Sequence, residues 1–212
     1  MKYFVKTPWW LKKLYPFYVW DIKTNEKVLY LSFDDGPHPV ITPFVLDKLK
    51  EYNAKATFFC LGKNVKAFPH IYKRIREEGH SVGNHTYNHL NGWKTSKDTY
   101  FNDVAEAAFI IDSFLFRPPY GRITTRQARL IKKAMNKPKA EIIMWSLLSG
   151  DFDPTNTKEK CMDNLIEHAK PGSIIVFHDS EKTYSLMSPT LDSSLKYFFE
   201  KGYRFDSLEN VF

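Results

Sequence analysis

Two histidines and two aspartates stand at spacings that could hold a metal ion. His85 and His89 are four residues apart, so on a helical turn both imidazoles would face the same way and could share one cation. A carboxylate from Asp34 or Asp35 would complete a two-histidine, one-carboxylate set with open positions, a pattern typical of catalytic zinc that other divalent ions also accept. Each feature alone also fits an ordinary polar turn.

The sequence Asp34–Pro37 and three further positions suggest how acid–base chemistry could accompany such an ion. Because two adjacent carboxylates in a tight turn cannot do the same job, one can bind the metal while its neighbour accepts a proton from water. Arg117, which two prolines follow, can pair with the free aspartate and hold its orientation. His178 is a candidate proton donor, since Asp151 could bind its other ring nitrogen and raise its pKa.

Alternating apolar strands and helical patterns predict the elements that would position these residues. Strands are predicted at 28–33, 56–60, 80–83, 114–116, 141–147, 173–177 and 203–206. Helices are predicted between them at 41–49, 65–78, 96–111, 125–135, 157–169 and 190–201. This alternation implies parallel strands joined by right-handed crossovers. The predicted fold class is α/β, a single distorted (β/α) barrel with about seven parallel strands, and an open doubly wound sheet is the alternative.

The polar residues that could do chemistry all follow the ends of predicted strands. They are Asp34 and Asp35 after the first strand, His85 and His89 after the third, Arg117 after the fourth, Asp151 after the fifth and His178 at the end of the sixth. The carboxyl ends of parallel strands lie on one face of a sheet or barrel, where active sites are built. The sequence therefore predicts one site formed by all five clusters.

Composition limits the class of protein. The chain has 212 residues, of which 43% are hydrophobic, 26% charged and 16% aromatic, and this suits one compact domain with a sizeable core. The longest unbroken apolar run is about five residues, too short to span a bilayer. The two cysteines, Cys60 and Cys161, are predicted to be free thiols, one in a strand and one in a helix.

The positive charge is concentrated at the N-terminus. The net charge is +7, but residues 1–30 hold six lysines against Asp21 and Glu26, a local charge of +4. Since a nucleic-acid binder spreads basic residues over its folded body, we expect no nucleic-acid partner. Pro8 and Lys12–Lys13 interrupt the N-terminal apolar run without a cleavage site, unlike a signal peptide. This favours a cytoplasmic location, with the cell envelope or a membrane surface as the alternative.

Aromatic residues alternate with those lysines, and we expect residues 1–27 to form a basic aromatic extension packed on a catalytic domain of residues 28–212. The aromatics are Trp9, Trp10, Tyr15, Phe17, Tyr18 and Trp20. Such a mixture can lie on a membrane interface as a peripheral contact. The alternative, which we prefer, is that these side chains plug the inactive end of the barrel. The sequence says nothing about oligomeric state.

The strand-end residues occur in motifs that resemble those of the polysaccharide deacetylase family, carbohydrate esterase family 4. In chain order the five similar segments are Ser32–Pro37 (SFDDGP), His85–His89 (HTYNH), Arg117–Tyr120 (RPPY), Trp145–Phe152 (WSLLSGDF) and Val176–His178 (VFH). They follow the family's order and span residues 28–180. The resemblance implies the same distorted (β/α) barrel with fewer than eight strands.

The resemblance also implies a role for each residue. Asp34 would be the catalytic base and His178 the general acid, with Arg117 orienting Asp34 and Asp151 tuning His178. Asp35, His85 and His89 would hold one divalent metal ion, zinc or otherwise cobalt, nickel or manganese. The backbone N–H of Tyr120 would stabilise the oxyanion, and Val176 and Trp145 would border the substrate, although Trp145 fits a strand core equally well.

The implied reaction is hydrolysis of N-acetyl groups on N-acetylglucosamine-containing glycans such as chitin or peptidoglycan, with an acetylated glycan as the partner. Alternatives are a hydrolase of another small amide or an O-acetyl ester, and an inactive glycan-binding domain. Three positions depart from the family pattern, where an aspartate, a tryptophan and a leucine are usual. They are Leu148, Phe152 and Val176, and they leave the shape of the substrate groove open.

Overall fold

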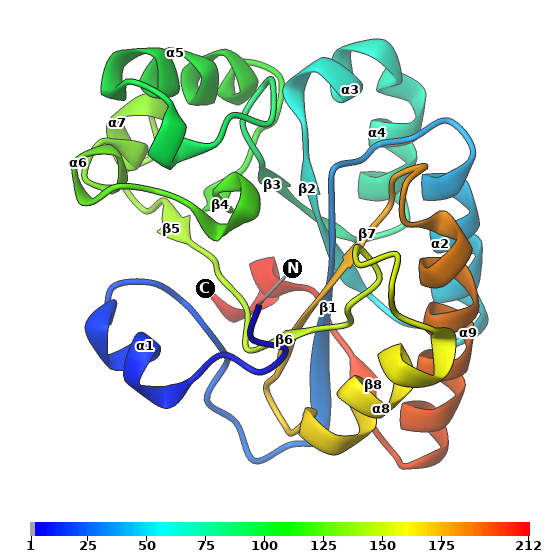
Figure 1. Cartoon of the computed structure of the whole chain (residues 1–212). Helices are drawn as coiled ribbons and strands as arrows, with labels where there is room; N and C mark the ends of the chain where they lie inside the picture. The colour runs from blue at the N-terminus through cyan, green and yellow to red at the C-terminus, as the bar shows by residue number, and fades with distance from the viewer. Residues whose placement is uncertain (1–2) are drawn as a thin grey trace.

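A parallel β-sheet forms the centre of the molecule and curls into an incomplete barrel (Figure 1). The computed structural model describes residues 3–212, so Lys2 of the N-terminal lysine group lies outside the described residues. Seven strands are neighbours in the order β5-β4-β3-β2-β1-β7-β6, and β8 pairs with β1. Their bounds are β1 Val28–Asp34, β2 Ala56–Cys60, β3 Ser81–Asn84, β4 Leu115–Phe116, β5 Glu141–Ile142, β6 Leu147–Leu148, β7 Ile174–His178 and β8 Arg204–Phe205. All their ladders are parallel, which confirms the predicted distorted barrel.

Helices connect the strands and cover the outside of the sheet (Figure 1). The α-helices are α1 Trp9–Leu14, α2 Ile41–Glu51, α3 Gly62–Ala67, α4 Pro69–Glu77, α5 Lys97–Ala108, α6 Thr125–Ala128, α7 Ile131–Ala134, α8 Lys158–His168 and α9 Tyr184–Glu200, and the 3₁₀ turns are η1 Gly92–Lys94, η2 Pro119–Gly121 and η3 Leu208–Val211. Ser96 caps α5 as its sequence suggests, because its hydroxyl accepts the Thr99 N–H. Within residues 3–212 no helix is both long and apolar enough to cross a membrane.

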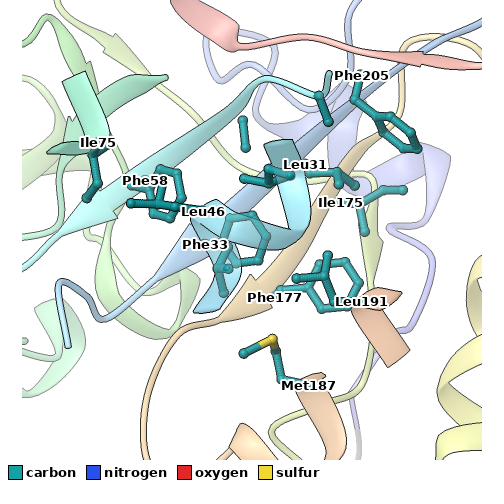
Figure 2. Close-up of a cluster of buried hydrophobic side chains, with 14 of the residues drawn as sticks. Leu31, Phe33, Leu46, Phe58, Ile75, Ile175, Phe177, Met187, Leu191 and Phe205 are labelled. Carbon is teal, nitrogen blue, oxygen red and sulfur yellow. The ribbon is translucent and has the colours of Figure 1, made fainter. Parts of the chain in front are cut away.

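The core lies between the sheet and the helices α2, α4 and α9 (Figure 2). Every residue of β1 is buried, as expected for a central strand of a parallel sheet that is covered on both faces. The ring of Phe33 stacks on Phe58 and Phe177, with centroids 5.1 and 5.8 Å apart. Both cysteines are buried free thiols, in β2 and α8, as predicted.

Three predicted elements are divided in the structure. The expected strand at 141–147 is two short strands, β5 and β6, because the carbonyls of Ile143 and Met144 accept hydrogen bonds from a buried arginine. The helix expected at 65–78 is α3 and α4, with the break at Pro69, which has no N–H to continue α3. The helix expected at 125–135 is α6 and α7, and the last helix begins earlier than predicted, at Tyr184.

The N-terminal segment runs along the opening between β5 and β6. Lys6 pairs with Leu147, Val19 with Ile143 and Asp21 with Ser173. Of the six aromatics in residues 9–20, Trp20 is the one that is buried, in a cluster with Tyr100 and Phe116. The plug interpretation is therefore wrong for Trp9, Trp10, Tyr15 and Phe17, which are exposed. The helix α1 packs no residue into the core, and Tyr18 is only partly buried against the Trp20 cluster.

A close backbone contact at Gly172 fastens the N-terminal segment to the barrel. Gly172 has φ +80°, and an added Cβ would lie 1.8 Å from the Ile22 carbonyl oxygen. Its own carbonyl accepts the Ile22 N–H at 2.9 Å. Only glycine satisfies both the left-handed backbone and this approach.

We expect Gly172→Ala to lower the free energy of unfolding by clearly more than Gly202→Ala does, measured by urea denaturation. Gly202 also has a left-handed φ (+77°) but nothing within 4 Å of an added Cβ. The control variant should therefore cost about 1 kcal/mol for the backbone alone, and Gly172→Ala should add roughly 1–3 kcal/mol for the overlap with Ile22. Equal losses would show that the contact with Ile22 is not tight.

Candidate active site

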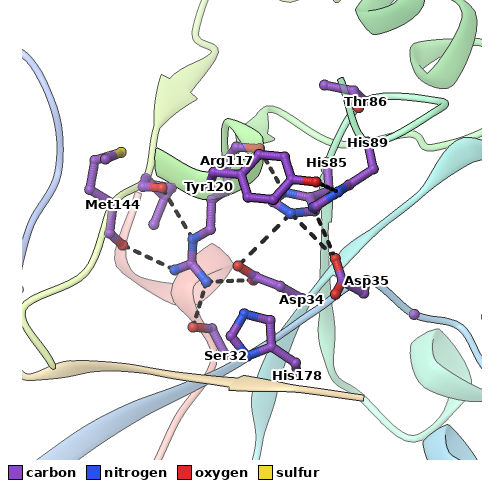
Figure 3. A network of polar contacts seen from close by, with 12 residues as sticks. Ser32, Asp34, Asp35, His85, Thr86, His89, Arg117, Tyr120, Met144 and His178 are labelled. Carbon is purple, nitrogen blue, oxygen red and sulfur yellow. Dashed lines mark hydrogen bonds and ion pairs between the residues drawn. The ribbon is translucent and has the colours of Figure 1, made fainter. Parts of the chain in front are cut away.

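The carboxyl ends of the central strands bring the sequence-predicted polar residues together (Figure 3). Asp34 ends β1 and Asp35 follows it, while His85 follows β3 and Arg117 follows β4. His178 ends β7, which pairs with β1 so that Asp34 and His178 are direct neighbours across the ladder. One face of the sheet thus carries all of them, as the parallel arrangement requires.

Asp35, His85 and His89 form a set that could hold a metal ion. One ligand atom from each residue lies within 4.8 Å of the other two. Oδ1 of Asp35 lies 3.1 Å from Nε2 of His89 and 3.8 Å from Nε2 of His85. The same oxygen is buried without a hydrogen bond from any described residue.

The hydrogen bond on the far side of His85 fixes the tautomer of that ring. The Nδ1 of His85 lies 2.7 Å from the Arg117 carbonyl oxygen and must donate to it, because a carbonyl can only accept. In the neutral ring Nε2 then carries a lone pair that faces the Asp35 carboxylate. Burial lowers the pKa of His85 to about 4, so the ring is neutral near pH 7. Facing lone pairs of this kind favour a cation between them.

The pKa of Asp35 is held well below its usual range. Burial raises it, but the facing imidazoles of His89, His178 and His85 outweigh that effect. The carboxylate is therefore ionised over the whole physiological range, which is the form that binds a metal ion.

The segment 85–89 is a loop and not the helical turn expected from the four-residue spacing. Thr86 and His89 adopt left-handed φ angles of 66° and 62°. The carboxylate of Asp103, on α5, accepts the N–H groups of Tyr87 and Asn88 at 2.8 and 3.0 Å. The two imidazoles converge because this loop is folded back by hydrogen bonds to a buried aspartate.

Arg117 is completely buried and holds Asp34 in place. Its Nη1 donates to Oδ1 of Asp34 and to Oγ of Ser32, both at 2.7 Å. Its Nε and Nη2 donate to the carbonyls of Ile143 and Met144 at 3.2 and 3.0 Å, and the guanidinium carbon lies over the Phe59 ring, 4.0 Å from its centroid. Figure 3 shows this fork of contacts. The predicted pair of Arg117 with Asp34 is present, and Oδ2 of Asp34 stays free of it.

His178 and Asp151 form the second predicted pair. Nδ1 of His178 lies 2.9 Å from Oδ1 of Asp151, and the other carboxylate oxygen accepts the His178 backbone N–H at 2.7 Å. Burial lowers the pKa of His178, but the charge and hydrogen bond of Asp151 outweigh it and raise the pKa to about 10. The imidazolium is therefore the stable form near neutrality, with Nε2 as the nitrogen that can release a proton.

The predicted substrate-contacting residues lie at different depths. Tyr120 has a left-handed φ of 60° and an exposed ring that packs on His89 with centroids 4.5 Å apart. Trp145 is half-buried beneath the turn, where a Cβ on Gly121 would lie 2.6 Å from its ring. Val176 is 1% exposed within β7, so its contact with substrate stays a prediction.

Phe152 stands where the family usually has tryptophan. Its ring contacts the imidazole of His178 with centroids 5.5 Å apart, and its other neighbour is Tyr3 at 4.8 Å. The N-terminal segment therefore supports the wall of the site next to the second pair. Leu148, the other departure, is 7% exposed and offers no charge to the site.

Asp179, directly after His178, was not among the residues predicted for the site. Its Oδ1 accepts the Gly36 N–H at 3.0 Å, its Oδ2 accepts the Thr42 hydroxyl, and its own N–H donates to the Asp34 carbonyl at 3.1 Å. Burial raises its pKa to about 8. It thus holds the backbone on both sides of Asp35, whose φ is 84°. The sequence signal that could have found it is an acidic residue directly after the strand-end histidine.

The fold is an α/β half-barrel with a polar site at the carboxyl ends of its strands, and comparison with known proteins gives the family. The family model for polysaccharide deacetylase matches residues 21–138. The chain belongs to the polysaccharide deacetylase family.

Relatives in this family align over three quarters or more of the chain. A peptidoglycan-N-acetylglucosamine deacetylase of Bacillus cereus is 34% identical over 208 residues, covering 94% of this chain and 96% of the relative. A chitooligosaccharide deacetylase of Azorhizobium caulinodans is 32% identical and covers 74% and 76% of the two chains. The crystal structure of the Bc1960 peptidoglycan N-acetylglucosamine deacetylase with 4-naphthalen-1-yl-N-oxidanyl-benzamide has a TM-score of 0.84 at 35% identity and 97% coverage of both chains.

We expect Asp179→Ala to lower the free energy of unfolding by about 1–3 kcal/mol, because the Gly36 N–H and the Thr42 hydroxyl lose a buried acceptor. Asp179→Asn should lose less, since its amide can accept from Gly36 and donate to Thr42. Asp192→Ala, at an exposed carboxylate paired with Lys48, is the control and should change little. Thermal and urea unfolding measure these differences, and an Asp179→Ala variant as stable as the control would contradict the role of Asp179.

The pair of His178 and Asp151 should make stability depend on pH. The folded-state pKa of His178 is about 10, above the ordinary 6.5. The protonated ring therefore stabilises the fold fully below pH 6.5, and this contribution is lost as pH rises toward 10. The loss can reach about 1.4 kcal/mol per pH unit. We expect urea unfolding of the metal-free protein to show this decline and the Asp151→Asn variant to lack it. Parallel curves for the two proteins would contradict the pairing.

Proposed function

We propose that the chain is a metal-dependent hydrolase that removes N-acetyl groups from N-acetylglucosamine-containing glycans and releases acetate and an amino sugar. The observation that carries this proposal is the convergence of three units on one face. These are the set Asp35, His85 and His89, the pair of Asp34 with Arg117, and the pair of His178 with Asp151. A ligand set, a base and an acid together are what hydrolysis of an amide needs.

The donor set fits one divalent cation. Two imidazole nitrogens and one carboxylate are ligands of the type found in catalytic zinc sites, and cobalt, nickel and manganese accept them as well. The buried Asp35 oxygen that has no hydrogen bond supports this assignment, because an orphaned carboxylate oxygen is costly unless a cation or donor meets it. When bound there, a cation would supply a Lewis acid that polarises the acetamide carbonyl and makes water more acidic.

Asp34 is placed to take the proton of the attacking water. Arg117 occupies Oδ1 of Asp34, so Oδ2 remains to accept a hydrogen bond from water on the site side. Because the guanidinium is fixed by Ser32 and two carbonyls, the carboxylate cannot rotate away. A base held in one orientation loses little entropy at the moment of proton transfer.

His178 is placed to complete the reaction from the other side. Asp151 holds the ring by Nδ1 and keeps it protonated, so Nε2 can deliver its proton to the departing amine nitrogen. The backbone N–H of Tyr120, at the left-handed turn after Pro119, would donate to the oxygen that gains negative charge. The Tyr120 ring over His89 covers one side of the site.

The names of the relatives suggest two glycans. The Bacillus cereus relative is a peptidoglycan-N-acetylglucosamine deacetylase and the Azorhizobium caulinodans relative a chitooligosaccharide deacetylase. Peptidoglycan is the substrate that we favour, because the relative of that name aligns over more of the chain at higher identity. Both glycans carry the same acetamide, so the chemistry derived above applies to either.

We expect zinc-loaded protein to release acetate from chitooligosaccharides and peptidoglycan glycan strands, and chelation to abolish the release until zinc is restored. Asp34→Asn and His178→Ala should each lower kcat at least about 100-fold, as loss of a general base or acid does. Asp192→Asn, at an exposed carboxylate, is the matched control. Chromatographic assay of acetate and of the free amine measures the reaction.

The same assay separates the alternatives. Acetate from O-acetyl esters without any amine product would favour an esterase. Glycan binding without acetate release from either substrate, in folded and zinc-loaded protein, would identify an inactive glycan-binding domain. Release that survives chelation, or variants as active as the control, would overturn the proposed mechanism.

A further inference from the structure

The helix α1 and its flanks form an exposed aromatic surface outside the active site. No residue of α1 is buried, and in Figure 1 the helix stands apart from the other helices at the edge of the barrel. We call this surface the aromatic patch. It consists of Phe4, Trp9, Trp10, Leu14, Tyr15 and Phe17. Soluble monomers rarely leave so many large apolar side chains together in contact with water.

The exposures show that the patch is not part of the core. The side chain of Phe17 is 88% exposed and that of Trp9 is 69% exposed, whereas Trp20, a few residues later, is 7% exposed. Backbone hydrogen bonds hold the segment before and after α1: the Thr7 N–H donates to the Ser146 carbonyl, and the Val19 N–H donates to the Ile142 carbonyl. The fold therefore fixes a short segment that presents its aromatics outward.

Two exposed lysines of the same segment accompany these rings. Residues 3–20 contain Lys6, Lys12 and Lys13 and no aspartate or glutamate. Lys6 and Lys13 are exposed, and Nζ of Lys13 lies 5.0 Å above the Trp9 ring. Lys12 instead forms an ion pair with Asp21 at the base of the segment. The patch thus joins apolar rings to uncompensated positive charge.

We propose that the aromatic patch docks the protein on the surface of an anionic lipid bilayer. Tryptophan partitions into the headgroup region, where its apolar rings and its indole N–H both find partners, and phenylalanine adds apolar area that is buried at the boundary with the acyl chains. Lysines beside them gain from the negative surface potential of anionic lipids. A six-residue helix is too short to be stable in water on its own. The backbone contacts of its flanks therefore hold α1 in place at the surface, where it could meet such an interface.

A second copy of the chain fits this surface less well. A two-fold symmetric contact would place the patch against itself, and Lys6 and Lys13 of the two copies would then repel each other across it. The patch also adjoins the site wall, since Tyr3 precedes Phe4 and contacts Phe152, which contacts His178. Docking would therefore bring the active site near the bilayer surface.

Co-sedimentation with lipid vesicles tests the proposal. We expect the protein to bind vesicles of phosphatidylcholine with added phosphatidylglycerol, to bind pure phosphatidylcholine at least about tenfold more weakly, and to be released by high salt. The triple variant Trp9→Ser, Trp10→Ser, Phe17→Ser and the double variant Lys6→Glu, Lys13→Glu should each bind at least about tenfold more weakly.

Matched controls lie elsewhere on the surface. Phe109→Ser with Phe199→Ser removes two exposed rings, and Lys132→Glu with Lys182→Glu reverses two exposed lysines; both should bind vesicles as the parent does. Far-ultraviolet circular dichroism checks that every variant is folded. Patch variants that bind as tightly as these controls, or a parent protein that ignores anionic vesicles, would overturn the proposal. Concentration-dependent dimerisation that the triple variant abolishes, without vesicle binding, would assign the patch to a second copy instead.

Discussion

The buried guanidinium of Arg117 is the interaction on which the rest of the site depends. It joins β1, through Ser32 and Asp34, to the segment between β5 and β6. The carbonyl of the same residue fixes the tautomer of His85. A buried charge is costly unless hydrogen bonds compensate it, and here each of the three guanidinium nitrogens donates, to Asp34, Ser32 and two backbone carbonyls. The hydrogen bonds that offset the desolvation of this cation are the same ones that position the residues of the site.

Around this centre the site separates its charges by environment. Asp35 and His85 are held ionised and neutral, respectively, on the side of the ligand set. His178 is held protonated by Asp151 on the other side. Asp179, in contrast, is a buried carboxyl whose pKa is raised and whose oxygens serve the backbone around Asp35. Groups whose pKa values are moved in opposite directions within one cluster are typical of acid–base catalysis.

Much of the fold and the site could be predicted from the sequence because both follow from patterns within short segments of the chain. Apolar strands alternating with helices indicate a parallel sheet, and polar residues at strand ends then converge. What could not be predicted depends on contacts distant in sequence. The division of 141–147 into two strands follows from the hydrogen bond that the Ile143 carbonyl accepts from Arg117. The loop at 85–89 follows from the hydrogen bond that Asp103, on a later helix, accepts from Tyr87. The exposure of Trp9 and the burial of Trp20 depend on how the N-terminal segment runs along the opening between β5 and β6.

The most direct test of this account is kcat for acetate release by a folded, zinc-loaded Arg117→Lys variant. Lysine keeps the positive charge but lacks the planar fork that serves Asp34 and the two carbonyls at once. If the guanidinium positions the base, kcat should fall at least about 100-fold. A variant that is folded and turns over as fast as the parent would contradict the central role of Arg117.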